Sequence, residues 1–119
     1  VNRKIVTDLE IRQFQFDGMK PTGHQVIATI PGGEQLRFMM AHDFDGDGRK
    51  EFIVAPMKTG LYYLSSKDGK TYEVQRFFEE SGGFEHAANL IDLDQDGTPE
   101  LYVADDANSK KLRRFTWKK

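Results

Sequence analysis

Asp43-Phe-Asp-Gly-Asp-Gly-Arg-Lys-Glu-Phe-Ile-Val-Ala55 is repeated later in the chain as Asp92-Leu-Asp-Gln-Asp-Gly-Thr-Pro-Glu-Leu-Tyr-Val-Ala104. Both copies follow the pattern D-x-D-x-D-G-x-x-E, and four apolar residues come directly after it. The copies lie 49 residues apart, and the same offset relates Gly33 to Gly82. A repeat period of roughly 20–50 residues indicates an architecture built from stacked supersecondary units. We therefore interpret the chain as a series of such units.

The residues around the two acidic stretches have the pattern of short β-strands. Phe52–Ala55 and Leu101–Ala104 are rich in β-branched and aromatic residues, a composition typical of strands. Two further apolar segments, at Leu36–Ala41 and His86–Ile91, precede the acidic stretches. Each acidic stretch is therefore predicted to be a loop between two strands.

The rest of the repeat predicts a hairpin. Leu61–Leu64 and Thr71–Phe78 flank the turn sequence Lys67-Asp-Gly-Lys70. An Asp-Gly pair is a strong hairpin signal because both residues tolerate positive φ angles. Each repeat is therefore expected to contain four short strands, two around the acidic loop and two in this hairpin.

Four antiparallel strands in about 50 residues are the unit of a β-propeller blade. The predicted fold is all-β, with four-stranded antiparallel β-propeller blades that make up about two and a quarter blades of an incomplete ring. Residues 1–31 are expected to supply the last two strands of a preceding blade, roughly Lys4–Phe16 and His24–Ile30. Residues 32–80 are expected to form a full blade, and residues 81–119 most of a following blade. Because a ring typically needs about four to eight blades, we expect a segment of a longer chain or a subunit that completes its ring with other copies.

The composition is that of a globular chain. Of its 119 residues, 38% are hydrophobic and 30% are charged, and no segment approaches the ~20 consecutive apolar residues of a membrane-spanning helix. The absence of cysteine excludes a disulfide scaffold, a thiolate zinc site and a cysteine nucleophile. The formal net charge of -2 conceals an acidic chain with a basic end, because six of the last ten residues are Lys or Arg.

Each acidic stretch places four carboxylates within nine residues, which is unfavourable unless a cation is present. Calcium takes about six to eight oxygen ligands, and a loop with acidic side chains at positions 1, 3 and 5, a glycine at 6 and a carbonyl at 7 can surround it. Alternate side chains point to the same side, so Phe44 and Leu93 are expected to point away from the ion. We predict one calcium ion in each loop. The predicted ligands are Asp43, Asp45, Asp47, the Arg49 carbonyl and Glu51, then Asp92, Asp94, Asp96, the Thr98 carbonyl and Glu100.

Three other interpretations of the loops fit the sequence less well. An EF-hand requires a glutamate at position 12 and flanking helices, but position 12 is Val54 in one copy and Val103 in the other. Magnesium demands a stricter octahedron with fewer protein ligands. An ordinary solvated turn explains one such loop more easily than two loops in register.

The first copy, from Asp43 to Pro56, resembles the calcium-loop half of the FG-GAP repeat, also called the VCBS-type repeat. That family is known from integrin α-subunit propellers and many secreted bacterial proteins. The second copy resembles it through Ala104, where Asp105 replaces the proline. The resemblance covers about residues 33–117, although the Phe-Gly pair that names the family is missing before the loops. It implies that each calcium loop connects the first two strands of a blade.

The sequence contains no recognisable catalytic motif. The patterns G-x-S-x-G, G-x-x-x-x-G-K-[ST] and G-x-G-x-x-G are absent, and His24, His42 and His86 lack the spacing of a zinc site. We therefore expect no catalytic residues and a non-catalytic module for adhesion, carbohydrate binding or scaffolding. By resemblance, the alternative is the propeller part of a secreted carbohydrate-active enzyme, of the polysaccharide lyase or sugar dehydratase type, with its catalytic residues outside this segment.

Location and partners follow from the same reasoning. Calcium sites of modest affinity would stay empty in the cytosol, so we expect an extracellular, periplasmic or cell-surface location. The expected partners are the remainder of the propeller, from the same longer chain or from other copies, and a protein or carbohydrate ligand. The side chains of the basic segment 110–119 have the alternating pattern of a half-buried outer strand, which puts Arg113, Phe115 and Trp117 on one face. For this reason we expect no nucleic-acid binding, and the absence of a long apolar segment predicts no membrane insertion.

Overall fold

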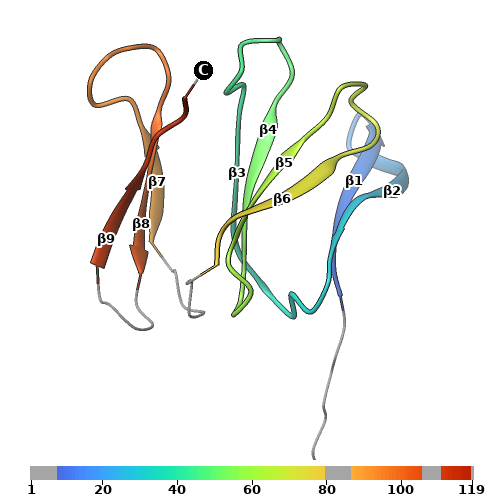
Figure 1. The fold of residues 1–119 in the computed structure, drawn as a ribbon. Helices are drawn as coiled ribbons and strands as arrows, with labels where there is room; N and C mark the ends of the chain where they lie inside the picture. The colour runs from blue at the N-terminus through green and yellow to red at the C-terminus, as the bar shows by residue number, and fades with distance from the viewer. Residues whose placement is uncertain (1–7, 80–86, 106–110, 119) are drawn as a thin grey trace, which may run out of the picture.

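The computed structural model describes residues 8–79, 87–105 and 111–118. Within these ranges the chain forms nine β-strands and no helix, so none of the described segments is a membrane-spanning helix (Figure 1). The strands are β1 (Leu9–Asp17), β2 (Lys20–Ile30), β3 (Leu36–His42), β4 (Glu51–Pro56), β5 (Leu61–Ser65), β6 (Glu73–Phe78), β7 (Ala88–Ile91), β8 (Glu100–Asp105) and β9 (Lys111–Phe115).

The strands form three separate sheets that stand side by side (Figure 1). The first sheet contains β1 and β2, the second contains β3-β4-β5-β6, and the third contains β7-β8-β9. All neighbouring strands run antiparallel. The predicted all-β class with antiparallel blade-like sheets is therefore confirmed, and the three described sheets do not close a ring. The predicted division at residues 31/32 and 80/81 stays a prediction.

The central position of β4 explains its unbroken run of apolar residues. Val54 belongs to the core between the first and second sheets, where it packs with residues such as Ile30. Ile53 belongs to the core between the second and third sheets, together with Leu101. Since successive side chains of a strand point to opposite faces, a strand that is covered on both faces needs apolar residues at every position.

Both hairpins differ from their predicted strand boundaries because of their turns. In the first, β2 begins at Lys20 rather than His24, since a two-residue turn at Gly18-Met19 allows Asp17 to pair with Lys20. In the second, β6 begins at Glu73 rather than Thr71. The predicted residues 4–7 and His86 lie outside the described residues.

Asp68 explains the late start of β6. Its carboxylate accepts hydrogen bonds from the amides of Thr71 and Lys70, at 2.9 and 2.8 Å, and from the Ser66 hydroxyl at 3.1 Å. These bonds, with the Thr71 amide as the largest contributor, lower the pKa of Asp68 to about 2. The turn therefore extends through Thr71, and the strand follows it.

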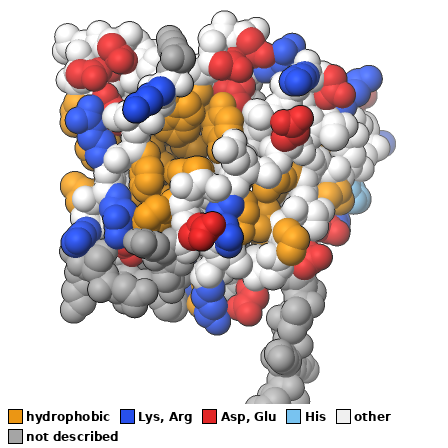
Figure 2. Space-filling view, in the orientation of Figure 1, with side chains coloured by type: hydrophobic (Ala, Val, Ile, Leu, Met, Phe, Trp, Pro, Cys, Tyr) orange, Lys and Arg blue, Asp and Glu red, His pale blue; other side chains and the backbone are white. Residues whose placement is uncertain are grey.

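The third sheet packs against the second through aromatic side chains. Phe115 contacts Phe77 and Phe78, each with ring centroids 5.4 Å apart, and Figure 2 shows hydrophobic side chains between the two sheets. Arg113, Phe115 and Trp117 are partly buried and the residues between them are exposed, as the strand period predicts. Asp105, which stands where the first copy has Pro56, is buried and forms an ion pair with Arg113 at 2.9 Å.

Candidate metal centres

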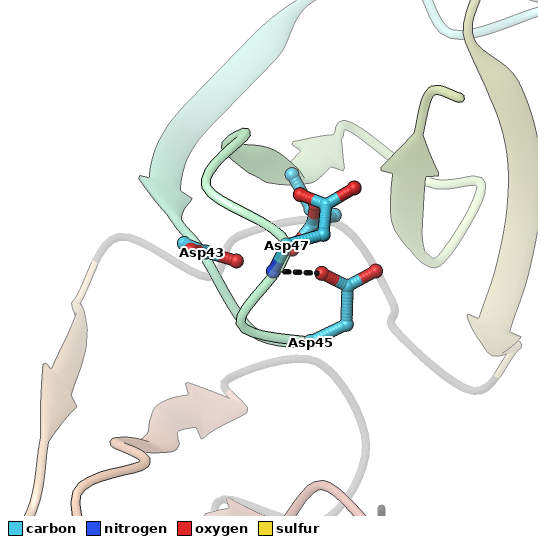
Figure 3. Close-up of side chains that lie close together, drawn as sticks. Asp43, Asp45 and Asp47 are labelled. Carbon is cyan, nitrogen blue, oxygen red and sulfur yellow. Dashed lines mark hydrogen bonds between the residues drawn. The ribbon is translucent and has the colours of Figure 1, made fainter. Parts of the chain in front are cut away.

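The first acidic loop joins β3 to β4 and gathers its four carboxylates around one point. One oxygen of each of Asp43, Asp45, Asp47 and Glu51 lies within 4.8 Å of the corresponding oxygens of the others. Figure 3 shows the three aspartates around the turn, with the Asp47 amide donating to Asp45. The structure thus brings together all four acidic side chains that the sequence predicted as ligands in this loop.

Backbone amides shape this loop. The amides of Gly46 and Gly48 donate to the two oxygens of Asp43 at 2.8 and 2.9 Å, and the Arg49 amide donates to Asp47 at 2.8 Å. Such local bonds are the reason that aspartate favours turns. Gly48 has a φ of 89° and its counterpart Gly97 has a φ of 92°, a conformation that glycine adopts without steric cost. The glycine at position 6 is therefore required by the backbone of both loops.

Amide donation also affects the charge of Asp43. Burial alone would raise its pKa, but hydrogen bonds from the amides of Gly48, Gly46 and Asp47 outweigh this and lower the pKa. Asp43 is thus held as a carboxylate, the form that binds a cation.

Glu51 links the loop to the core. Its side chain is buried and accepts a hydrogen bond from the Phe44 amide at 2.7 Å. This bond holds the Phe44 backbone so that its ring, 2% exposed, packs between the second and third sheets. The ring stacks on Trp117 with centroids 4.0 Å apart and planes 9° apart. Phe44 therefore points away from the carboxylates, as the alternation predicts.

The second loop joins β7 to β8 and repeats the arrangement with one exception. Oxygens of Asp92, Asp94 and Glu100 lie within 4.8 Å of one another, but Asp96 does not join this group. The Asp96 amide donates to Asp92 and Asp94 at 3.1 and 3.2 Å, and its carboxylate accepts from the Thr98 amide at 2.8 Å, as the Asp47 carboxylate accepts from the Arg49 amide.

Two further differences distinguish the second loop. Gln95 has a φ of 61° where the first loop has Gly46. A residue other than glycine therefore adopts the left-handed backbone conformation that favours glycine. Leu93, the counterpart of Phe44, is 62% exposed, although its amide still donates to Glu100 at 3.1 Å. The second sheet packs against the third sheet. On the opposite face of the third sheet, no further sheet is present among the described residues.

The carboxylates of the second loop also influence one another. The Asp96 amide lowers the pKa of Asp94, but desolvation and the charges of Asp96 and Glu100 raise it by more, so the net shift is upward. The pKa of Glu100 is lowered, first by the Leu93 amide and also by the charge of Arg114.

Three residues near these sites were not predicted as part of them. Tyr63, Arg114 and Trp117 come from the third strand of a sheet or the residues just after it. Tyr63 and Arg114 contact loop glutamates, and Trp117 contacts Phe44. These contacts depend on the register between strands, for which the sequence offers no local signal.

The donor set fits a hard divalent cation. All the gathered side-chain donors are carboxylate oxygens, the ligands that calcium, magnesium and manganese prefer over soft or nitrogen donors. Hydrogen bonds from backbone amides to Glu51 and Asp43 fix the positions of several of these oxygens without an ion. Both acidic clusters could therefore hold a metal ion.

Three blade-like antiparallel sheets with an acidic loop between the first two strands of the second and third define a β-propeller-type module. The family model of the FG-GAP-like repeat matches residues 43–103, just over half of the chain. The chain belongs to the FG-GAP-like repeat family, as the resemblance predicted. It matches no curated protein and no solved structure.

Proposed function

We propose that this chain is a calcium-binding β-propeller segment of a secreted or surface protein, in which it acts as a non-catalytic binding, adhesion or scaffold module. The observation that carries the proposal is the convergence of four loop carboxylates within 4.8 Å in the second sheet. The recurrence of three converging carboxylates at the same place in the third sheet supports it, and so does membership of the FG-GAP-like repeat family.

The proposed role of the ion is structural. Asp43, Asp45, Asp47, Glu51 and the Arg49 carbonyl would hold it in the first loop, and the corresponding residues in the second. Bound calcium would offset the repulsion among the carboxylates and tie the loop to the strand that begins at Glu51. With a dissociation constant of ~0.1 mM and free calcium of ~1 mM, each filled site would add about 1.4 kcal/mol of stability.

Affinity of this order also supports the proposed location. Calcium concentrations near 1 mM are found outside cells, and sites with a dissociation constant of about 10⁻⁴ M or more are typical of extracellular modules. An extracellular, periplasmic or surface location is therefore part of the proposal.

We expect calcium to raise the melting temperature and EDTA to lower it. The stabilisation above corresponds to about 5 °C for each site. Asp45→Ala and Asp94→Ala should each remove part of the calcium-dependent increase, whereas Asp17→Ala, outside the loops, should leave it intact. Differential scanning calorimetry of the four proteins, with and without calcium, measures these shifts. Identical melting curves of the unmodified chain in both buffers would contradict the proposal.

Exposed apolar side chains on the third sheet support a partner. Leu93 and Leu112 are 62% and 73% exposed, and Leu93 stands at the loop position where Phe44 is buried by the next sheet. We propose that further blades, from the same longer chain or from other copies, cover this surface. The 119-residue chain is then expected to associate in solution, and sedimentation equilibrium that shows only a compact 13.7 kDa monomer would contradict this.

A further inference from the structure

The two acidic loops face different residues at one equivalent position on the third strand of their sheets. Ile53 and Tyr102 are 49 residues apart and occupy the same place in the repeat. In the second sheet Ile53 pairs with Tyr63, and in the third sheet Tyr102 pairs with Arg114. Tyr63 and Arg114 are therefore structural counterparts, although 51 rather than 49 residues separate them.

Arg114 places a positive charge against the second loop. Its Nη2 lies 3.4 Å from Oε1 of Glu100 and 3.8 Å from Oδ2 of Asp94. The other oxygen of Glu100 already accepts the Leu93 amide. Because Glu100 is buried, it cannot turn away from the guanidinium, whereas Arg114 is 51% exposed and can. A side-chain cation thus lies close to two of the three carboxylates that converge in this loop.

The first loop meets a neutral group at the same position. The Tyr63 hydroxyl is hydrogen-bonded to Glu51. A tyrosine hydroxyl is uncharged at neutral pH, so it places no positive charge against the carboxylates of the first loop. The hydroxyl satisfies the glutamate without neutralising the loop.

Arg49 does not reproduce the arrangement of Arg114. It is part of the first loop and forms an ion pair with Asp47 at 2.6 Å, a contact between residues two apart in the sequence. Both side chains of this pair are partly exposed, at 47% and 31%, and such pairs contribute little. Arg114, by contrast, reaches two carboxylates from another strand, and one of them is buried.

We propose that Arg114 is a built-in competitor for the cation of the second loop, so that the first loop binds calcium more tightly and fills first. This inference rests on the proposed function of the loops as calcium sites. The affinity of an oxygen-ligand loop is set by the charge of its ligands and by its rigidity. A guanidinium beside the ligands at loop positions 3 and 9 offsets part of that charge, and an ion must displace it to bind both carboxylates fully. The residue at this position of the third strand therefore sets the calcium affinity of each loop.

Isothermal titration with calcium chloride on single-loop variants tests the proposal. Asp45→Ala leaves the second loop intact, and adding Arg114→Gln should raise its calcium affinity about tenfold, whereas Arg114→Lys, which keeps the charge, should not. Asp94→Ala leaves the first loop intact, and adding Tyr63→Arg should lower its affinity by a similar factor. Lys50→Gln removes a cation of the same loop that lies outside the predicted ligand set; as the matched control in that background it should change the affinity by less than about threefold. Circular dichroism verifies that each variant is folded.

The outcomes separate this inference from the proposed function. If both single-loop variants bind calcium but Arg114→Gln leaves the affinity unchanged, the competitor role is wrong and the calcium sites stand. An equal increase from Lys50→Gln and Arg114→Gln would also overturn it, because any nearby positive charge would then act alike. If calcium produces no binding heat with the unmodified chain or any folded variant, the proposed function fails together with the inference.

Discussion

Phe44→Ala is expected to lower the free energy of unfolding by about 3–5 kcal/mol, the usual cost of removing a large aromatic side chain from a core. The ring is 2% exposed and belongs to the core that joins the second and third sheets. It stacks on Trp117 at 4.0 Å and also contacts Tyr63 at 6.1 Å between ring centroids. Urea denaturation followed by circular dichroism measures the loss.

The chain contains its own control for this experiment. Leu93 occupies the same loop position but is 62% exposed, so Leu93→Ala should change stability by no more than about 0.5 kcal/mol. Trp117 is the only tryptophan, and its fluorescence should move to longer wavelength in Phe44→Ala and stay unchanged in Leu93→Ala. Equal losses in the two variants would show that Phe44 does not anchor the third sheet.

Glu51→Ala should destabilise the chain by about 2–3 kcal/mol even in calcium-free buffer. The substitution removes a charged acceptor and leaves the buried Phe44 amide without the bond that it makes at 2.7 Å. Glu51→Gln keeps an acceptor of similar shape and should lose less. Urea denaturation of both variants in EDTA isolates this contribution from any effect of metal.

The calcium-free condition decides between two roles for Glu51. If Glu51→Ala matched the unmodified chain in EDTA and differed only with calcium, the glutamate would act solely as a ligand. The burial of its side chain and its bond to Phe44 instead predict two separable losses, one with and one without the ion.

Much of the fold could be predicted because its signals are local. The continuous apolar run after Glu51 reflects a strand covered on both faces, and the Asp-Gly pair at residue 68 reflects a hairpin. The spacing of the acidic residues was sufficient to predict which carboxylates meet in the first loop. These features depend on the alternation of side chains and on turn chemistry, which act over a few residues.

The remainder depends on relations between distant residues. The pairing of Tyr102 with Arg114, and of Ile53 with Tyr63, follows from strand register, and the two copies differ there by a change in the length of the connection. Asp96 matches the pattern but lies outside the converging group, although its carboxylate accepts the Thr98 amide just as that of Asp47 accepts the Arg49 amide. A one-dimensional motif shows which side chains are available but not how each one is oriented.

The stack of Phe44 on Trp117 makes the loop of one sheet depend on the sheet that follows it in the chain. The ring comes from the loop of one sheet, and its partner comes from the sheet that follows in the chain. Displacement of the later sheet would loosen the backbone that Glu51 holds in the earlier loop, whereas Leu93, at the equivalent place, touches no such neighbour among the described residues. Loss of the third sheet is therefore expected to loosen the first acidic loop, whereas the second loop has no such dependence on a later sheet among the described residues.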